Sequence, residues 1–117
     1  MSDEAKKATT VYRKGGNDGY IEMLPGIRRR TLLWADMTLF AEFKLDAGSK
    51  IPEHSHPEEQ TGYMLSGRMT FHGPDGDFEA EPGDSWVFPG GVPHSVDVHE
   101  DAHVIEVFSP ARKDYMA

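Results

Sequence analysis

The chain has 117 residues, of which 38% are hydrophobic, and a formal net charge of −8. This length and composition predict one small domain with a single hydrophobic core. The negative charge disfavours general binding to nucleic acid or to an anionic membrane, because phosphate groups would repel the chain. Since the sequence has no cysteine, it excludes disulfides and thiolate ligands, which leaves nitrogen and oxygen atoms to hold any metal ion.

The N-terminal segment MSDEAKKATT is charged and polar, whereas a signal peptide has an apolar core. We expect residues 1–10 to form a flexible arm, followed by a barrel over about residues 20–110, within a single domain of residues 1–117. No segment approaches the roughly 18 consecutive apolar residues of a membrane helix. These features favour a cytoplasmic protein that does not bind membranes.

Next along the chain is a run of three basic residues, Arg28, Arg29 and Arg30, although the sequence as a whole has a negative net charge. Neighbouring residues of a strand point to opposite faces. At least one of these arginines is therefore expected to face the mouth of a barrel, where it would contact a ligand. The alternative for all three is a solvated side chain.

From residue 38 onward, short alternating segments are separated by Gly, Pro and Asp, which predicts an all-β fold. The segment 38–45 places apolar residues at every second position, beginning at Leu39. Turns are expected at 46–49, 73–76 and 81–84. The expected strands are 38–45, 60–66, 68–72, 77–80, 85–88, 92–98 and 102–108, a spacing typical of a sandwich or barrel.

His54 and His56 are the first residues whose pattern predicts chemistry. In an extended strand, residues two apart share a face, so the two imidazoles would lie side by side, roughly 7 Å apart at Cα. Gln60 and His94 add an amide oxygen and a third imidazole. Together these four residues predict a metal site.

Two longer segments contain these residues and resemble the motifs of a known family. GSKIPEHSHPEEQTGYMLSG and GDSWVFPGGVPH, which ends at His94, resemble the two motifs of the cupin family. Gln60 stands where that family usually has Glu, and Val98 stands where Asn is frequent. The resemblance implies an all-β, single-domain cupin, that is, a double-stranded β-helix or jelly-roll barrel.

A neutral ligand set of three imidazoles and one amide favours a single divalent Zn, Mn, Fe, Ni or Co ion over Ca or Mg. Because Gln60 replaces a carboxylate, such an ion would keep its full positive charge. We therefore expect the site to attract a small anionic molecule and to act as a Lewis acid. As an alternative, Gln60 is only a polar residue of the barrel, and the three histidines hold the ion.

The last expected strand contains a carboxyl group among apolar residues. Val104, Glu106 and Phe108 share one face of this strand. If that face points inward, burial raises the pKa of Glu106 and suits it to proton transfer near the metal. If instead the face of Ile105 and Val107 is buried, Glu106 lies in solvent. The alternating pattern alone is compatible with both arrangements.

The segment EVFSPARKDY, taken with GDSWVFPGGVPHSV, resembles small pectin-degradation cupins of the KdgF type over nearly the whole chain. This resemblance implies ring opening and tautomerisation of 4,5-unsaturated uronates, with the metal held by the four residues named above. It implies catalysis by Glu106 and Arg112, and substrate binding by Phe108 and Arg112. The chain departs from this type at Glu106, where Asp is usual, and at Ala111, where a second Pro is usual.

Two other classes of function fit the same residues. One is a different metal-dependent cupin enzyme, either a dioxygenase or a sugar isomerase, and the other is a non-catalytic sensor that binds a small carboxylate. Instead of binding substrate, Arg112 could be a solvated residue that forms an ion pair with Asp114. The expected ligand is a sugar acid. The limited core of a small barrel, together with the edge-strand pairing that the resemblance to such cupins implies, favours a homodimer. His72, His99 and His103 are expected to be surface or loop residues.

Overall fold

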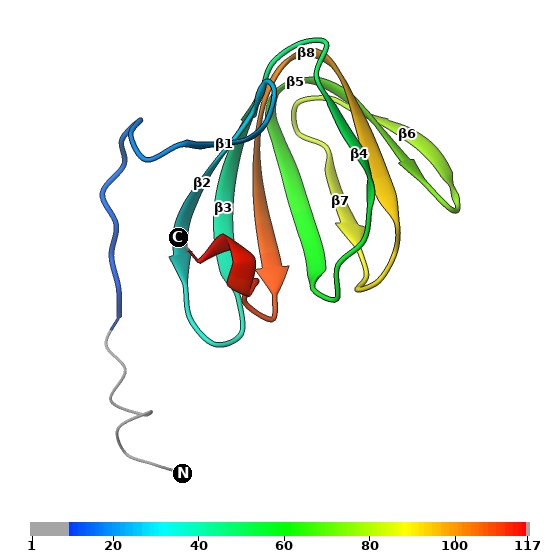
Figure 1. The fold of residues 1–117 in the computed structure, drawn as a ribbon. Coiled ribbons are helices and arrows are strands. Elements are labelled where there is room, and N and C mark those ends of the chain that lie inside the picture. The colour runs from blue at the N-terminus through cyan, green and yellow to red at the C-terminus, as the bar shows by residue number, and fades with distance from the viewer. Residues whose placement is uncertain (1–9, 117) are drawn as a thin grey trace.

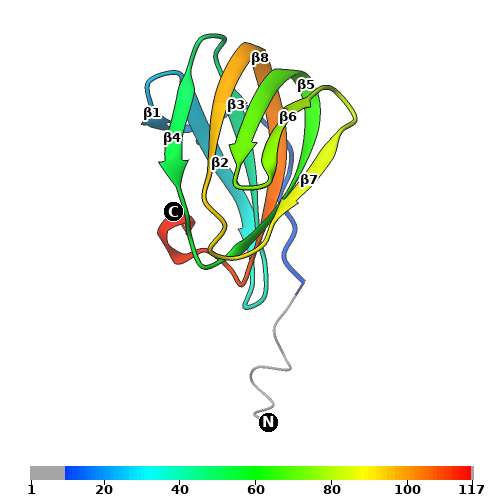
Figure 2. The same ribbon diagram turned by 90° about the vertical axis from the view of Figure 1, so that its right-hand side faces the viewer.

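The computed structural model describes residues 10–116, which form an all-β fold in two layers (Figures 1 and 2). Within this part of the chain, no helix is long and apolar enough to cross a membrane. The elements are β1 (Ile21–Leu24), β2 (Ile27–Trp34), β3 (Leu39–Leu45), β4 (Lys50–His54), β5 (Glu59–Gly73), β6 (Gly76–Ala80), β7 (Ser85–Phe88), β8 (His94–Ser109) and the single-turn 3-10 helix η1 (Lys113–Tyr115).

The strands β5 and β8 are long and belong to both layers. The first half of β5 pairs with β7 and with the second half of β8, whereas its second half pairs with β6 and with the first half of β8. In one layer β8 also pairs with β3, followed outward by β2 and β1, and in the other layer it pairs with β4. The arrangement is the jelly roll expected from the sequence.

The expected separate strands 60–66 and 68–72 are in fact one strand, β5, and the expected strands 92–98 and 102–108 both lie in β8. The layers meet at Gly67, which has φ of +97° and lies between two register shifts in the pairing with β8. A Cβ atom at this position would collide with Ala102 of β8. Glycine therefore bends the strand at this corner while the hydrogen bonding continues beyond it.

β3 confirms the alternation expected for 38–45, since Leu39 and every second residue after it are buried. The expected turns are also present. The amide of Ser49 donates to the Asp46 carbonyl, and the amide of Asp84 donates to the Glu81 carbonyl. The structure has three strands that the sequence did not predict: β1, β2 and β4. Consecutive arginines in β2 and a proline in β4 obscure the alternation of apolar and polar residues.

The three arginines of β2 have different environments. Arg28 pairs with Asp46 at the surface. Arg30 makes two hydrogen bonds of 3.1 and 2.8 Å to Glu42 of the neighbouring strand β3. Arg29 is only 3% exposed, and its side chain makes no hydrogen bond or ion pair with any residue in the range 10–116. It is the one of the three that faces the interior, as expected for at least one of them.

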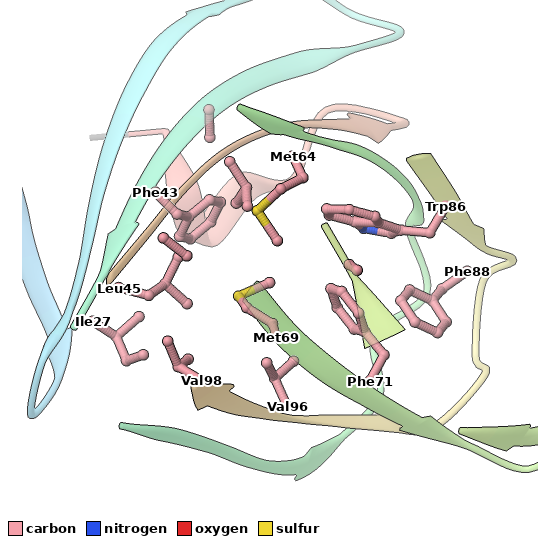
Figure 3. Close-up of a cluster of buried hydrophobic side chains, with 14 of the residues drawn as sticks. Ile27, Phe43, Leu45, Met64, Met69, Phe71, Trp86, Phe88, Val96 and Val98 are labelled. Carbon is pink, nitrogen blue, oxygen red and sulfur yellow. The ribbon is translucent and has the colours of Figure 1, made fainter. Parts of the chain in front are cut away.

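Buried apolar side chains from both layers face one another in the interior (Figure 3). Phe71, Trp86 and Phe88 form an aromatic group, with the ring centroids of Phe71 and Trp86 4.7 Å apart. Met64 and Met69 lie in the middle of the same view. This packing leaves a cavity toward one side of the barrel.

The N-terminal residues of the described chain run beside β2 (Figure 1). Arg13 donates a hydrogen bond of 3.0 Å to the Thr31 carbonyl, which lies in the part of β2 not paired with β1. The guanidinium thus contacts an otherwise open strand edge. The flexible arm expected for residues 1–10 lies, apart from Thr10, outside the described residues.

Candidate metal centre and its cavity

Three histidines meet where β4 and β8 lie side by side. His54 ends β4, His56 follows in the next loop, and His94 begins β8 in direct register with His54. One ligand atom from each ring lies within 4.8 Å of the others. The sequence-based expectation that His54 and His56 share an extended strand is wrong, because β4 ends at His54. The loop after β4 nevertheless brings the His56 ring to the cluster.

Each imidazole of this cluster is oriented by a backbone carbonyl. The Nδ1 atoms lie 3.0, 2.9 and 2.9 Å from carbonyl oxygens in the pairs His54–Pro52, His56–Glu58 and His94–Val92. Because a carbonyl oxygen only accepts hydrogen bonds, each Nδ1 carries the hydrogen, and the Nε2 atom of the neutral ring keeps a free lone pair. Metal-binding histidines are typically held by this kind of outer hydrogen bond.

Burial favours the neutral form of two of these rings, those of His56 and His94. It lowers the pKa of His94 to about 4. Burial, followed by the charge of Arg112, also lowers the pKa of His56. The Nε2 atom of His94 is buried and has no hydrogen-bond partner among residues 10–116. A buried lone pair without a partner is unfavourable, and a bound cation would satisfy it.

Gln60 of β5 completes the set of donors. Its Oε1 atom lies 2.9 Å from His56 Nε2, and its Nε2 atom donates to Glu106. Since His56 carries its hydrogen on Nδ1, the two facing atoms are both acceptors, and they repel unless a cation lies between them. The distance of 2.9 Å between these two atoms is the distance expected for two adjacent ligand atoms on one metal ion, each bound to it at roughly 2.1 Å. His54, His56, Gln60 and His94 therefore fit a divalent transition-metal ion.

Glu106 faces the interior, together with its neighbours Val104 and Phe108. The alternative arrangement, with Ile105 and Val107 buried and the carboxyl in solvent, does not occur. Figure 3 labels Trp86, whose Nε1 atom donates a hydrogen bond of 3.0 Å to the carboxyl oxygen Oε2.

The same Oε2 atom accepts the hydrogen bond from Gln60, so a single amide joins the Glu106 carboxyl to the histidine cluster. Burial raises the pKa of Glu106 to about 7, although the hydrogen bonds from Gln60 and Trp86 and the charge of Arg112 oppose the shift. At neutral pH the carboxyl is thus close to the midpoint of its titration.

Arg112 follows β8 and lies over two aromatic rings, 5.2 Å from the ring centre of Phe108 and 3.9 Å from that of Tyr115. Its Nε atom donates to Asp114 at 3.0 Å, which is the ion pair considered from the sequence. The side chain is nevertheless only 12% exposed and lines the cavity, so it is not a solvated residue.

These residues surround a cavity of about 380 Å³ between the two layers. Its polar lining comprises Glu53, His54, Gln60, His94, Glu106, Arg112 and Tyr115. Apolar side chains that Figure 3 shows pointing inward, among them Ile27, Leu45, Met69 and Val96, form the remainder of the wall. The cavity therefore combines one polar, metal-proximal side with an apolar interior.

Sequence reasoning missed two residues at or beside the cavity, Trp86 and Tyr115. Trp86 could have been found from Gly62, because a glycine inside a strand often marks the close approach of another group. Gly62 lies opposite Trp86 in the pairing of β5 with β7, and a Cβ atom there would collide with the indole. Tyr115 had no such signal, since its position follows from the path of the chain after β8.

The other histidines have partners outside the cluster. His72 lies 2.8 Å from Asp97, and His103 lies 2.6 Å from Glu42. His99 lies 2.6 Å from the Thr70 hydroxyl. All three are in strands, with their side chains at least partly exposed, and among the described residues they do not belong to the metal-binding cluster.

Known proteins resemble this chain in sequence and in structure. A family model described as a cupin domain matches residues 41–108. KdgF from Halomonas sp. has 28% sequence identity and a TM-score of 0.78, over 83% of this chain and 92% of that one. An RmlC-like cupin from Shewanella frigidimarina has 22% identity and a TM-score of 0.85, over 92% and 97% of the two chains. A comparison with curated proteins finds no match.

The polyketide cyclase RemF from Streptomyces resistomycificus is also similar, with 25% identity and a TM-score of 0.66. That similarity covers 78% of this chain and 67% of the cyclase. The fold is thus common to proteins with different names, so the activity of this chain depends on its cavity residues.

Proposed function

Because the chain belongs to the cupin family, we propose a function within that family. We propose that the protein is a metal-dependent isomerase of the KdgF type that acts on 4,5-unsaturated uronates. One observation carries the proposal. The Glu106 carboxyl is buried in the same cavity as the histidine cluster and Arg112, and Gln60 connects it to that cluster. An acid, a cation-binding cluster and a guanidinium thus converge on one space of small-molecule size.

Arg112 would bind the carboxylate of the substrate. Its Nε atom is occupied by Asp114, whereas its two terminal nitrogens make no hydrogen bond with any residue in the range 10–116. A guanidinium can hold a carboxylate through two parallel hydrogen bonds. Phe108, which packs beneath Arg112, would form the wall against the sugar ring.

Glu106 would move the proton. Its Oε2 atom already accepts hydrogen bonds from Gln60 and Trp86, which leaves Oε1 for the substrate. Ring opening removes a proton from the anomeric hydroxyl and breaks the bond from that carbon to the ring oxygen, which leaves an aldehyde and an enolate. Return of the same proton to the enolate carbon then gives the ketone, so the reaction conserves all atoms. One carboxyl can accept this proton and return it.

A divalent ion bound by His54, His56, Gln60 and His94 would supply Lewis-acid polarisation of a substrate oxygen. The amide of Gln60 fixes both the ligand oxygen and the Glu106 carboxyl, which makes it a shared support of the two functions. The partner expected from the sequence is a second copy of the chain, and the expected compartment is the cytoplasm; both stay predictions.

The test is an ultraviolet and NMR assay of the metal-loaded protein with freshly released 4,5-unsaturated galacturonate. We expect Glu106→Gln, which preserves the shape of the side chain, to lower the rate by about 100-fold or more, because it removes the proton acceptor. Gln60→Ala should lower the rate as well. His99→Gln is the matched control, since its ring contacts Thr70 outside the cavity. A rate equal to the spontaneous one for the unchanged protein would contradict the proposal.

A further inference from the structure

Tyr115 is held firmly at the wall of the cavity. It ends η1, which lies against the β2–β3 side of the barrel (Figure 1). Its backbone carbonyl accepts a hydrogen bond of 2.6 Å from the Thr31 hydroxyl, and its amide donates to the Arg112 carbonyl at 3.0 Å. Its ring packs edge-on against Phe108, with ring centres 5.2 Å apart. The tyrosine is therefore a fixed part of the wall.

Two guanidinium groups contact this one ring. The central carbon of Arg29 lies 4.2 Å from the ring centre, and that of Arg112 lies 3.9 Å from it. Arg29 is buried, and its Nε atom has no hydrogen-bond partner among the described residues. Burying a charge without a counter-ion is unfavourable, whereas an aromatic face attracts a cation. The Tyr115 ring is thus the principal favourable contact of the Arg29 guanidinium, and this contact holds the ring.

The hydroxyl of Tyr115 is left without a partner. It makes no hydrogen bond with any residue in the range 10–116, and the partly buried side chain lines the cavity together with Glu106 and Arg112. A tyrosine hydroxyl in such a wall can donate a hydrogen bond to a ligand that enters the cavity. Burial raises the pKa of Tyr115, so the hydroxyl keeps its hydrogen at neutral pH and can donate it.

We propose that Tyr115 is a ligand-contacting residue of this cavity, whose hydroxyl donates a hydrogen bond to an oxygen of a bound sugar acid, and that Arg29 is the positioning residue that holds its ring. The inference rests on the proposed function only in taking a uronate as the ligand. It assigns to the hydroxyl a role in affinity, and to the buried Arg29 a role that acts through Tyr115.

The test uses the zinc-loaded protein and galacturonate, a saturated uronate, with calorimetric measurement of the dissociation constant. Tyr115→Phe keeps the ring and its contacts with both arginines but removes the hydroxyl. We expect it to weaken binding about three- to tenfold, the effect of one lost hydrogen bond, without lowering the melting temperature. Tyr63→Phe, which changes a tyrosine that is 43% exposed, is the matched control and should bind like the unchanged protein.

Arg29→Met tests the positioning role through a double-mutant cycle. It should weaken binding in the unchanged protein but cause no further loss in the Tyr115→Phe background, a pattern that a general loss of stability would not produce. Unchanged binding by Tyr115→Phe overturns the hydroxyl contact while leaving the proposed reaction intact, and additive effects overturn the role of Arg29. If the unchanged protein itself fails to bind galacturonate, the proposed substrate class falls, and this inference falls with it.

Discussion

At the scale of single residues, the histidines of this chain differ in the hydrogen-bond partners of their rings. The three histidines of the cluster have one kind of partner, and the histidines outside it have another. Backbone carbonyls contact Nδ1 of the three clustered rings, and burial lowers the pKa of His56 and His94. Carboxylates contact the rings of His72 and His103, and the pKa of His72 is raised by hydrogen bonds with Asp97 of β8 and Asp77 of β6. The first environment leaves a free lone pair for a metal ion, whereas the second favours the protonated ring.

His72 should therefore make the stability of the fold depend on pH. The folded protein binds the proton of His72 more tightly than the unfolded chain does, so the stabilisation is fully present below the ordinary pKa of 6.5 and is lost as the pH rises through the raised value. Lys50 also pairs with Asp97, at 3.6 Å.

The measurement is the melting temperature of His72→Gln at about pH 5.5 and about pH 8.5, with a larger loss expected at the lower pH. His99→Gln is the control, because its ring contacts a hydroxyl and has no carboxylate partner among residues 10–116. An equal loss for His72→Gln at both pH values would show that its charge does not stabilise the fold.

The sequence predicts which residues supply metal ligands at the candidate site, but it predicts only part of their arrangement in space. His54, His56, Gln60 and His94 were identified from residue type and spacing, and the structure brings them together. Whether Glu106 faces inward could not be decided from alternation alone, because both faces of its strand carry apolar residues. Gly62 was the one sequence signal for the close approach of Trp86. The contacts of Tyr115 depend on how distant segments pack, which no local pattern encodes.

At the scale of the strands, the sequence locates breaks but does not say whether hydrogen bonding stops at them. Gly67 was expected to separate two strands, and it instead marks the corner of β5. Polar residues near Asp101 likewise predict a gap between the expected strands 92–98 and 102–108, but this segment lies beside Gly67 and is part of the continuous strand β8. β3 was fully predictable, because one of its faces is buried throughout.

Replacement of Gly67 tests the importance of this corner. Gly67→Ala forces a side chain into a left-handed backbone conformation and against Ala102, so we expect a loss of about 2–4 kcal/mol in the free energy of unfolding. Gly83→Ala is a matched control, since Gly83 has a similar φ of +94° but nothing within 4 Å of an added Cβ. It should lose only about 1 kcal/mol. Urea unfolding measures both, and equal losses would mean that the close approach of β8 has no energetic effect.

At the scale of the whole molecule, the acidic balance affects every experiment with metal ions. With 20 acidic and 12 basic side chains, the surface attracts any divalent cation, so binding alone does not identify the histidine site. Binding at the histidine site and binding at surface carboxylates can be distinguished by the choice of cation. Neutral imidazoles favour transition metals such as zinc, whereas carboxylates also bind hard cations such as magnesium. A specific site must therefore stabilise the fold with zinc but not with magnesium.

Zinc should raise the stability of the folded chain by mass action, because the cluster of His54, His56 and His94 joins strands that separate on unfolding. At a zinc concentration of about 1,000 times the dissociation constant, the gain is about 4 kcal/mol, which corresponds to a melting temperature higher by on the order of 10 °C. The same concentration of magnesium should give little change. His54→Asn removes one ligand at a half-buried position and should abolish most of the zinc effect, while His99→Gln should retain it. If His54→Asn gained as much stability from zinc as the unchanged protein, the ion would be bound elsewhere, and the surface carboxylates would be the first place to look for it.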